Sequence, residues 1–320
     1  MPVVLRLMAR TLEARAGFLA RNDFARIMAL AFCLCVGALT LLGVDVAGGA
    51  FPGHNGRIAF VRTRNGRSQI WVVNGDGTKL RRLTHGSGDP ENPAFSANGK
   101  LIAFDSDRRG NFDVYVMRAD GSHMRRVTSS PADEKEPSFS PSGKRIAFTR
   151  HGDIYVVNAN GSGEQQITTD REQGAFAHDP AFSPNGNEIA FSSGLNQNNR
   201  SIFLVGVDRR NRHLLTNDTP YDDNHPAFSP HGTRVAYDSH PEMEQGPNDI
   251  RVVGAAGKHK RFLPTGNSDI GEPAFSPTGH RIVAADQEGF GGILVMDVNG
   301  HHRHRITNFG SSPDWQPKAR

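Results

Sequence analysis

Short runs of β-branched and aromatic residues recur along this chain at a regular interval. The clearest marker is Pro-x-Phe-Ser followed by a Gly-containing turn. It occurs at Pro93, Pro137, Pro180, Pro226 and Pro273, and in a shortened form at Pro313. A period of roughly 40 to 47 residues, filled by short apolar runs without helical periodicity, is typical of a β-propeller blade.

Each repeat divides into four predicted strands, here called a to d. Strand a contains Pro-x-Phe-Ser, and strand b carries an Ile-Ala-Phe core such as Ile102-Ala103-Phe104. Strand c is apolar, as in Ile154-Tyr155-Val156-Val157, which suits a strand covered on both faces. Strand d is polar, as in Arg81-Arg82-Leu83-Thr84, which suits an exposed edge. The pattern predicts an all-β fold with four-stranded antiparallel blades.

The first blade lacks its own strand a. Strands b to d occupy residues 56–84 without a preceding Pro-x-Phe-Ser, whereas the chain ends in Pro313-Asp314-Trp315-Gln316-Pro317. We expect this C-terminal strand to complete the first blade and close the ring. Five complete repeats and one composite repeat therefore predict a six-bladed β-propeller over residues 51–320.

A hydrophobic segment precedes the propeller. Residues 27–44 contain no charged residue, follow an Arg-rich stretch, and are followed by small residues at 47–50. This pattern makes residues 1–50 a signal peptide or an N-terminal membrane anchor, and the length of the run fits both. Either interpretation exports the propeller, so we expect it to be periplasmic, extracellular, or held at the outer face of the cytoplasmic membrane. The membrane is expected as a partner only through this segment, if it is uncleaved.

Charge and cysteine content exclude several classes of function. The net charge of +4 comes partly from five Arg residues within 1–50, which leaves a nearly balanced propeller. Such a surface lacks the concentrated positive field that nucleic acids require, so no nucleic-acid partner is expected. Both cysteines, Cys33 and Cys35, lie in the hydrophobic segment, so the propeller has no disulfide, thiol nucleophile or Cys-based zinc site.

One repeat shows the full pattern especially clearly. Ser106-Asp107-Arg108-Arg109-Gly110-Asn111-Phe112-Asp113-Val114-Tyr115-Val116-Met117 is followed by Asp120-Gly121 and then by Arg126-Val127-Thr128. Together with Pro-x-Phe-Ser-Pro-x-Gly-Lys/Arg-Ile-Ala-Phe, this resembles the TolB-type, WD40-like propeller repeat over about residues 55–317. The motif is specific for the fold and weak for function, because such propellers serve many tasks.

The resemblance implies an exported, TolB-like propeller. Proteins of this family in the Tol-Pal envelope system are periplasmic and carry an α/β domain before the propeller. Only about fifty residues precede the first blade here, so we expect a TolB-like chain without that domain, and a Tol-Pal role stays open. The chain has no Gly-x-Ser-x-Gly elbow, so an attached hydrolase is not expected.

The candidate site lies at one end of the channel. Connections from strand d to a and from b to c leave the same end of the ring and include the long loops, where we expect partners to bind. The residues just before the six prolines should ring the channel mouth there. These are Asn92, Glu136, Asp179, His225, Glu272 and Ser312.

Two interpretations of this ring are open. Glu136, Asp179, His225 and Glu272 could converge on a hard cation or on a cationic group of a partner, with Asp222 and Asp223 adding negative charge. Among these, the candidate metal ligands are Asp179, His225 and Glu272. The alternative is that a residue before proline is simply extended, polar and solvated.

The pattern favours a binding scaffold over an enzyme, and it indicates no catalytic residue. We expect a protein or peptide ligand on the long-loop face. We expect no cofactor, except that the ring could hold a divalent cation in the channel mouth. The alternative function is a metal-dependent carbohydrate-binding or carbohydrate-active propeller centred on His225. Against it, the chain offers only two Trp and four Tyr as sugar platforms.

Overall fold

The computed structural model describes residues 51–195, 199–217, 221–241, 247–264, 268–287 and 291–318. The predicted export segment at residues 27–44 lies outside these ranges. Within them, no helix is both long enough and apolar enough to cross a membrane. The described residues belong to one compact unit, Ala47–Arg320.

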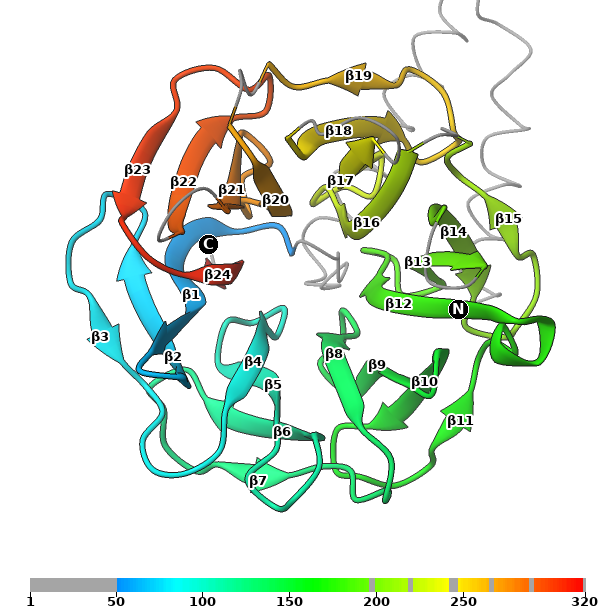
Figure 1. Cartoon of the computed structure of the whole chain (residues 1–320), viewed down its shortest axis with the longest axis horizontal. Helices are drawn as coiled ribbons and strands as arrows, with labels where there is room; N and C mark the ends of the chain where they lie inside the picture. The colour runs from blue at the N-terminus through cyan, green and yellow to red at the C-terminus, as the bar shows by residue number, and fades with distance from the viewer. Residues whose placement is uncertain are drawn as a thin grey trace, which may run out of the picture. The chain divides into compact units, whose positions relative to one another are not determined.

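Six four-stranded antiparallel sheets form a ring of blades, as the repeat predicts (Figure 1). In every blade the first strand lies innermost and the last lies at the rim. The first three blades, in the order a to d, are β24 (Ser311–Lys318), β1 (His54–Arg64), β2 (Arg67–Asn74) and β3 (Arg81–Arg82); β4 (Pro90–Phe95), β5 (Leu101–Ser106), β6 (Asp113–Arg118) and β7 (Arg125–Arg126); and β8 (Glu134–Phe139), β9 (Arg145–Arg150), β10 (Asp153–Asn158) and β11 (Gln165–Gln166).

The other three blades have the same order. They are β12 (Ala175–Phe182), β13 (Glu188–Leu195), β14 (Ser201–Gly206) and β15 (His213–Leu214); β16 (Tyr221–Phe228), β17 (Arg234–Pro241), β18 (Asp249–Gly254) and β19 (Arg261–Phe262); and β20 (Ile270–Phe275), β21 (Arg281–Asp286), β22 (Gly292–Asp297) and β23 (His304–Thr307). A short 3₁₀ helix, η1 (Arg171–Gln173), precedes β12.

The core lies between neighbouring blades. Each apolar cluster combines strands b and c of one blade with strands a, b and c of the next, as where Ile70 and Leu83 pack with Phe95 and Phe104. The Ile-Ala-Phe cores of strand b are fully buried, for example Phe148. Each blade therefore packs one face against the blade before it and the other face against the blade after it.

Small polar residues of the repeat have local structural roles. In the a-to-b turns the Gly of the Pro-x-Gly sequence has a positive φ of 66° at Gly143 and 71° at Gly186, which a glycine adopts without strain. In five of the six blades a Thr at or just beyond the end of the rim strand accepts a hydrogen bond from an apolar residue of strand c, as Thr128 Oγ1 does from Val114 N at 2.9 Å. This bond continues the sheet edge where the two-residue strand d has ended.

The C-terminal strand closes the ring, as predicted. β24 pairs antiparallel with β1, and Trp315 lies opposite Ile58 while Lys318 lies opposite His54. Trp315 is 4% exposed and packs between the last blade and the first, against Ile58, Val283 and Val295 among others. The two ends of the described chain therefore meet in one sheet.

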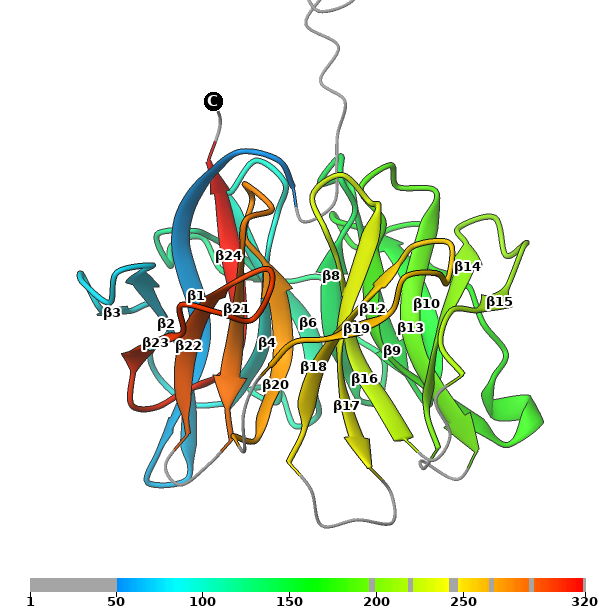
Figure 2. The ribbon, with the colours of Figure 1, turned by 90° about the horizontal axis from the view of Figure 1, so that it is seen from above.

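The propeller has two different ends. The hairpin face consists of the a-to-b turns (96–100, 140–144, 183–187, 229–233, 276–280) and the c-to-d turns (75–80, 119–124, 159–164, 207–212, 255–260, 298–303). The loop face consists of the b-to-c and d-to-a connections at the opposite end. Figure 2 shows the hairpin face at the top, where β24 ends.

Candidate binding site at the channel mouth

The six residues before the prolines sit at a bulge in each innermost strand. The register between strands a and b breaks across each of them, for example between Glu91 and Ala94 around Asn92. All six have a positive φ, from 47° at Ser312 to 58° at Glu136. The alternative interpretation, in which the backbone at these residues is extended, is therefore wrong. They also lie within their strands, which begin upstream of the prolines.

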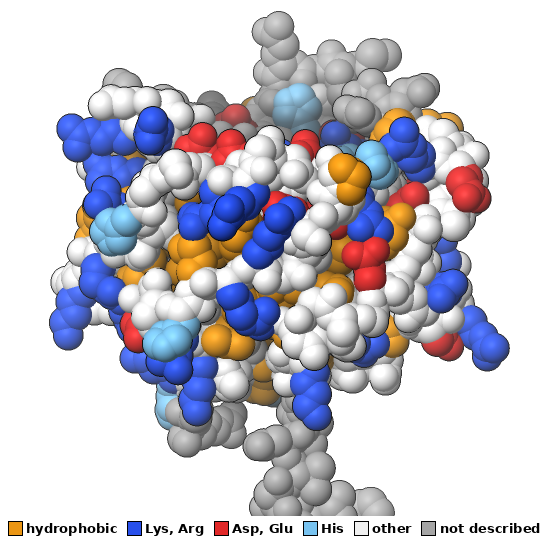
Figure 3. Space-filling view, turned by 90° about the horizontal axis from the view of Figure 1, so that it is seen from below, with side chains coloured by type: hydrophobic (Ala, Val, Ile, Leu, Met, Phe, Trp, Pro, Cys, Tyr) orange, Lys and Arg blue, Asp and Glu red, His pale blue; other side chains and the backbone are white. Residues whose placement is uncertain are grey.

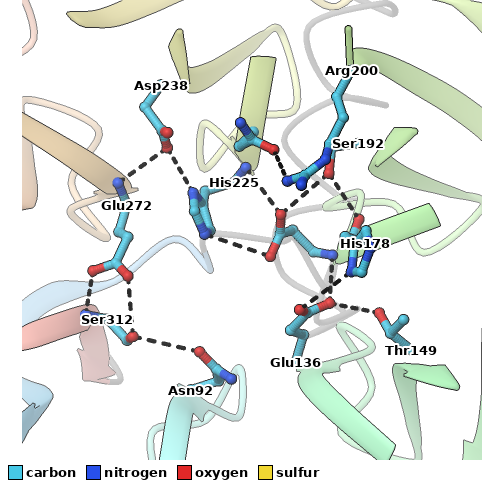
Figure 4. A network of polar contacts seen from close by, with 12 residues as sticks. Asn92, Glu136, Thr149, His178, Ser192, Arg200, His225, Asp238, Glu272 and Ser312 are labelled. Atoms are coloured by element: carbon cyan, nitrogen blue, oxygen red, sulfur yellow. Dashed lines mark hydrogen bonds and ion pairs between the residues drawn. The ribbon is translucent and has the colours of Figure 1, made fainter. Parts of the chain in front are cut away.

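The bulge follows from the chemistry of proline. Proline has no N–H for the ladder, so a strand that contains it must break its pairing locally. The residue before it takes the left-handed conformation, which costs an L-amino acid about 1–2 kcal/mol, and its side chain is turned toward the channel. Six equivalent bulges thus place six side chains around one opening, as Figure 4 shows for Asn92, Glu136, His225, Glu272 and Ser312.

A chain of hydrogen bonds joins the blades around this opening. The bulge leaves the backbone N–H of a ring residue without a ladder partner, and in five of the six blades a carboxylate of the preceding blade accepts it. Asp179 N donates to Glu136 Oε2 at 2.8 Å, and His225 N donates to Asp179 Oδ2 at 3.4 Å. The other three bonds run from Glu136 N to Asp105, from Glu272 N to Asp238 and from Ser312 N to Glu272.

A second set of contacts joins four of the six ring side chains to strand b of their own blade. The partners lie 13 residues apart in sequence and face each other across the bulge. The pairs are Asn92–Asp105 at 3.1 Å, Glu136–Thr149 at 2.7 Å, Asp179–Ser192 at 3.2 Å and His225–Asp238 at 2.8 Å. The ring acids are therefore held in fixed positions by hydrogen bonds.

Two histidines share the ring with these acids. His225 Nδ1 lies 2.8 Å from Asp238 Oδ1, and its Nε2 lies 3.6 Å from Asp179 Oδ1. Partial burial alone would lower the pKa of His225, but the charges of Asp179 and Asp238 outweigh it and hold that pKa well above the usual value.

His178 is 3.6 Å from Glu136 Oε1. Burial would raise the pKa of Glu136, but His178 outweighs it and lowers that pKa to about 2.

Acidic groups outnumber basic groups at the mouth. The carboxyl groups of Glu136, Asp179, Asp238 and Glu272 lie there with His178, His225 and Arg200. Asp105 is fully buried behind Asn92, and burial raises its pKa to about 7 despite the Asn92 hydrogen bond. The arrangement favours a cationic group at the opening.

Below the polar ring the channel becomes apolar. The ring residues, the prolines and the strand-a aromatic residues line a cavity of about 220 Å³. The strand-a Phe lies three positions after its ring residue, so at about 3.3 Å per residue the aromatic layer lies about 10 Å deeper. This layer consists of Phe95, Phe139, Phe182, Phe228, Phe275 and Trp315, and Phe51 also lines the cavity.

Asp314 is a wall residue that sequence reasoning missed. It occupies the x position of Pro-x-Phe, where the other repeats have Ala or Ser, and that departure was the available signal. Its side chain accepts a hydrogen bond from Phe95 N at 2.6 Å. Burial raises the pKa of Asp314 to about 7.

Other predicted residues lie elsewhere. Asp222 accepts a hydrogen bond from Arg200 N, and the buried Asp223 accepts one from Ser239 Oγ. Neither lines the cavity, so the structure does not bring them into the ring. Among the described residues no three His, Cys, Asp or Glu side chains are grouped to hold a metal ion, so Asp179, His225 and Glu272 stay a hypothesis to be tested by metal analysis.

Comparisons with known proteins agree on the fold. The family described as the TolB beta propeller domain matches residues 42–219 and 91–274. The crystal structure of TolB from Acinetobacter baumannii is 22% identical, with a TM-score of 0.70 over 82% of this chain and 67% of that one. A putative TolB from Agrobacterium tumefaciens is 19% identical, with a TM-score of 0.63 over 80% and 90%.

A more distant neighbour and the curated proteins complete the comparison. A chain from the crystal structure of a nidogen/laminin complex is 12% identical, with a TM-score of 0.67 over 82% of this chain and 99% of that one. No curated protein matches at a significant level. At these identities the structural neighbours establish the fold alone.

Proposed function

The chain belongs to the TolB beta-propeller domain family, and from that premise we propose that it is an exported, non-enzymatic scaffold that binds a protein or peptide at its channel mouth. The observation that carries the proposal is the closed, acid-rich ring of hydrogen-bonded residues around a cavity with an aromatic layer. A propeller fold by itself specifies no function, so the site must supply the argument.

The size of the cavity favours a side chain over a whole small molecule. At about 220 Å³ it is smaller than the roughly 300–1,000 Å³ of common small-molecule sites. It has room for one or two side chains that enter from the loop face. The best ligand is a protruding loop or an extended segment of a partner protein.

Charge and depth define the ligand further. An apolar side chain at the tip would reach toward the aromatic layer, where burial of apolar surface is favourable. A neighbouring Lys or Arg would stay at the opening beside Glu136, Asp179 and Glu272, whose positions are already fixed. Because these acids need no rearrangement, binding there costs little ordering entropy.

An exported location fits this role, and export is inferred from the sequence of residues 1–50 and not from their structure. The hydrophobic segment at 27–44 and the similarity to TolB proteins both favour a location outside the cytoplasm. A nidogen/laminin complex among the similar structures gives an example of a propeller found with a protein partner. We infer that this chain acts in the cell envelope.

Affinity capture from envelope extract tests the proposal. The wild type is compared with Glu136→Gln/Asp179→Asn/Glu272→Gln, because the amide oxygens can still accept the inter-blade hydrogen bonds while the charges are removed. A matched control is Asp107→Asn/Asp133→Asn/Asp222→Asn, which neutralises three loop-face acids that accept backbone N–H groups and lie outside the ring.

We expect the ring variant to lose a partner that the control retains. Each neutralised contact to a charged group should weaken binding by about 1.5–3 kcal/mol. If both variants retain the same partners as the wild type, the channel mouth is not the binding site.

A further inference from the structure

The two ends of the propeller carry different charges. The turns of the hairpin face hold nine exposed Lys and Arg residues and four exposed Asp and Glu residues. The nine are Lys79, Lys100, Lys144, Arg209, Arg210, Arg212, Lys258, Lys260 and Arg303, of which Arg212 forms an ion pair with the buried Asp170. Six exposed histidines lie on the same turns: His123, His231, His259, His280, His301 and His302. This end is therefore basic although the whole propeller is nearly neutral.

The loop face carries charges of both signs. It contains the ring acids and further acids on its connections, among them Asp89, Asp107, Asp133 and Asp269, together with the exposed Arg64, Arg67, Arg109 and Arg171. In the side view of Figure 3, Lys and Arg side chains lie over the whole height of the propeller, including the lower rim at the hairpin face, whereas Asp and Glu side chains lie mainly in the upper half. The hairpin face is therefore the more basic end.

Part of the basic face has no visible structural task. Arg81 and Arg125, at the start of rim strands, donate to carbonyl groups of the next c-to-d turn and join neighbouring blades. Lys100, Lys144 and Arg210 differ: within the described contacts only their main chains are used, and their side chains extend into solvent. Lys258 is likewise exposed, and its carbonyl bonds Gly254 N.

The chain leaves the propeller at this same face. Gly53 N donates to Pro277 O in an a-to-b turn, and His54 pairs with Lys318 at the end of β24. Only residues 45–50 separate Phe51 from the hydrophobic segment at 27–44, and six extended residues span at most about 20 Å. A membrane that holds the segment would thus be close to the hairpin face.

We propose that the hairpin face docks on a membrane surface rich in anionic phospholipid, and so turns the channel mouth away from the membrane. Charge complementarity and the short covalent path to the hydrophobic segment both favour a membrane surface at this face. Each Lys or Arg near an anionic bilayer strengthens binding by about fivefold. This inference concerns the face opposite to the ligand site, so its failure would leave the proposed function unaffected.

Vesicle flotation of the compact unit Ala47–Arg320 tests the docking, because all six sheets and their cores lie within that unit. Vesicles of phosphatidylcholine alone are compared with vesicles that also contain phosphatidylglycerol. Each is measured at about 0.1 M and about 1 M salt, where the screening length falls from about 10 Å to about 3 Å. We expect binding only to the anionic vesicles, and its loss at high salt.

Charge-reversal variants distinguish an effect of the hairpin face on vesicle binding from an effect of the overall net charge. Lys100→Glu/Lys144→Glu/Arg210→Glu/Lys258→Glu should weaken binding at least about 100-fold. The control Arg64→Glu/Arg67→Glu/Arg109→Glu/Arg171→Glu makes the same change in net charge on the loop face and should weaken it less than about threefold. The corresponding Gln variant on the hairpin face, which is milder for folding, should lie between the two.

The proposal is overturned by any of three results. These are absence of binding to anionic vesicles, equal binding to neutral vesicles, or equal loss in the hairpin-face and loop-face variants. Thermal unfolding of every variant verifies that each remains folded.

Discussion

Replacement of Trp315 by Ala tests how the ring is held closed. Trp315 is 4% exposed and packs on residues of both the first and the last blade. A buried aromatic side chain removes about 150–250 Å² from water, worth roughly 4–6 kcal/mol at 25 cal/mol per Å². Residual structure in the unfolded chain reduces this figure, and measured Trp→Ala substitutions cost about 3–5 kcal/mol. That is a large part of a typical total of about 5–15 kcal/mol.

Urea unfolding followed by far-ultraviolet circular dichroism measures this loss. The matched control is Leu195→Ala, because Leu195 is 62% exposed and its removal should change stability by less than about 0.5 kcal/mol. Deletion of residues 312–320 should abolish the cooperative transition, since it also removes the contacts that Asp314 and Gln316 make with the second blade. A Trp315→Ala cost below about 1 kcal/mol, or unfolding limited to one blade, would refute closure as the source of stability.

Three further predictions concern buried charge and metal. Burial raises the pKa of Asp105 to about 7, so folding is favoured while this carboxyl group is protonated. The resulting contribution to the free energy of unfolding is on the order of 4 kcal/mol. It is fully present below about pH 4 and is lost as the pH rises through about 7. Asp105→Asn should flatten this part of the pH profile of the free energy of unfolding, and an unchanged profile would contradict the assignment. Arg212→Ala should cost about 3 kcal/mol by leaving the buried Asp170 without its ion pair, and Arg212→Lys should recover part of that loss in urea unfolding. Elemental analysis of gently purified protein should find no stoichiometric metal, and chelation should leave the melting temperature unchanged; bound calcium, manganese or zinc would instead favour the carbohydrate-related alternative.

The fold could be predicted from sequence because each blade repeats the same local signals. The marker at Pro137, the turn at Gly143 and the core at Phe148 recur at matching offsets, and each agrees with the others on one strand order. Closure could be predicted as well, since the lone C-terminal copy has no other place in the ring. Because the same signals recur in every blade, the prediction does not depend on the weak β propensity of any single strand.

The location of the ring could be predicted, but its geometry could not. Local preferences make a residue before proline extended, and only the pairing of strand a with strand b forces the bulge and the positive φ of Glu136. Once that register is known, Thr149, 13 residues after Glu136, can be identified as its hydrogen-bond partner. Similarly, the hydrogen bonds between blades that Glu136 and Asp179 accept depend on the closed ring. Without knowledge of these bonds, the sequence alone made the ring acids resemble metal ligands.

Photo-crosslinking from inside the channel tests the central claim most directly. A small diazirine side chain replaces Ala227, which lines the cavity, or Leu214, an exposed rim residue that does not. Both proteins are irradiated in the envelope, with the native ring and with Glu136→Gln/Asp179→Asn/Glu272→Gln. The account predicts a crosslink from Ala227 alone, to a partner segment with an apolar residue beside Lys or Arg, and its loss in the ring variant. Equal crosslinks from both positions, or a crosslink from Ala227 that survives loss of the ring charges, would contradict it.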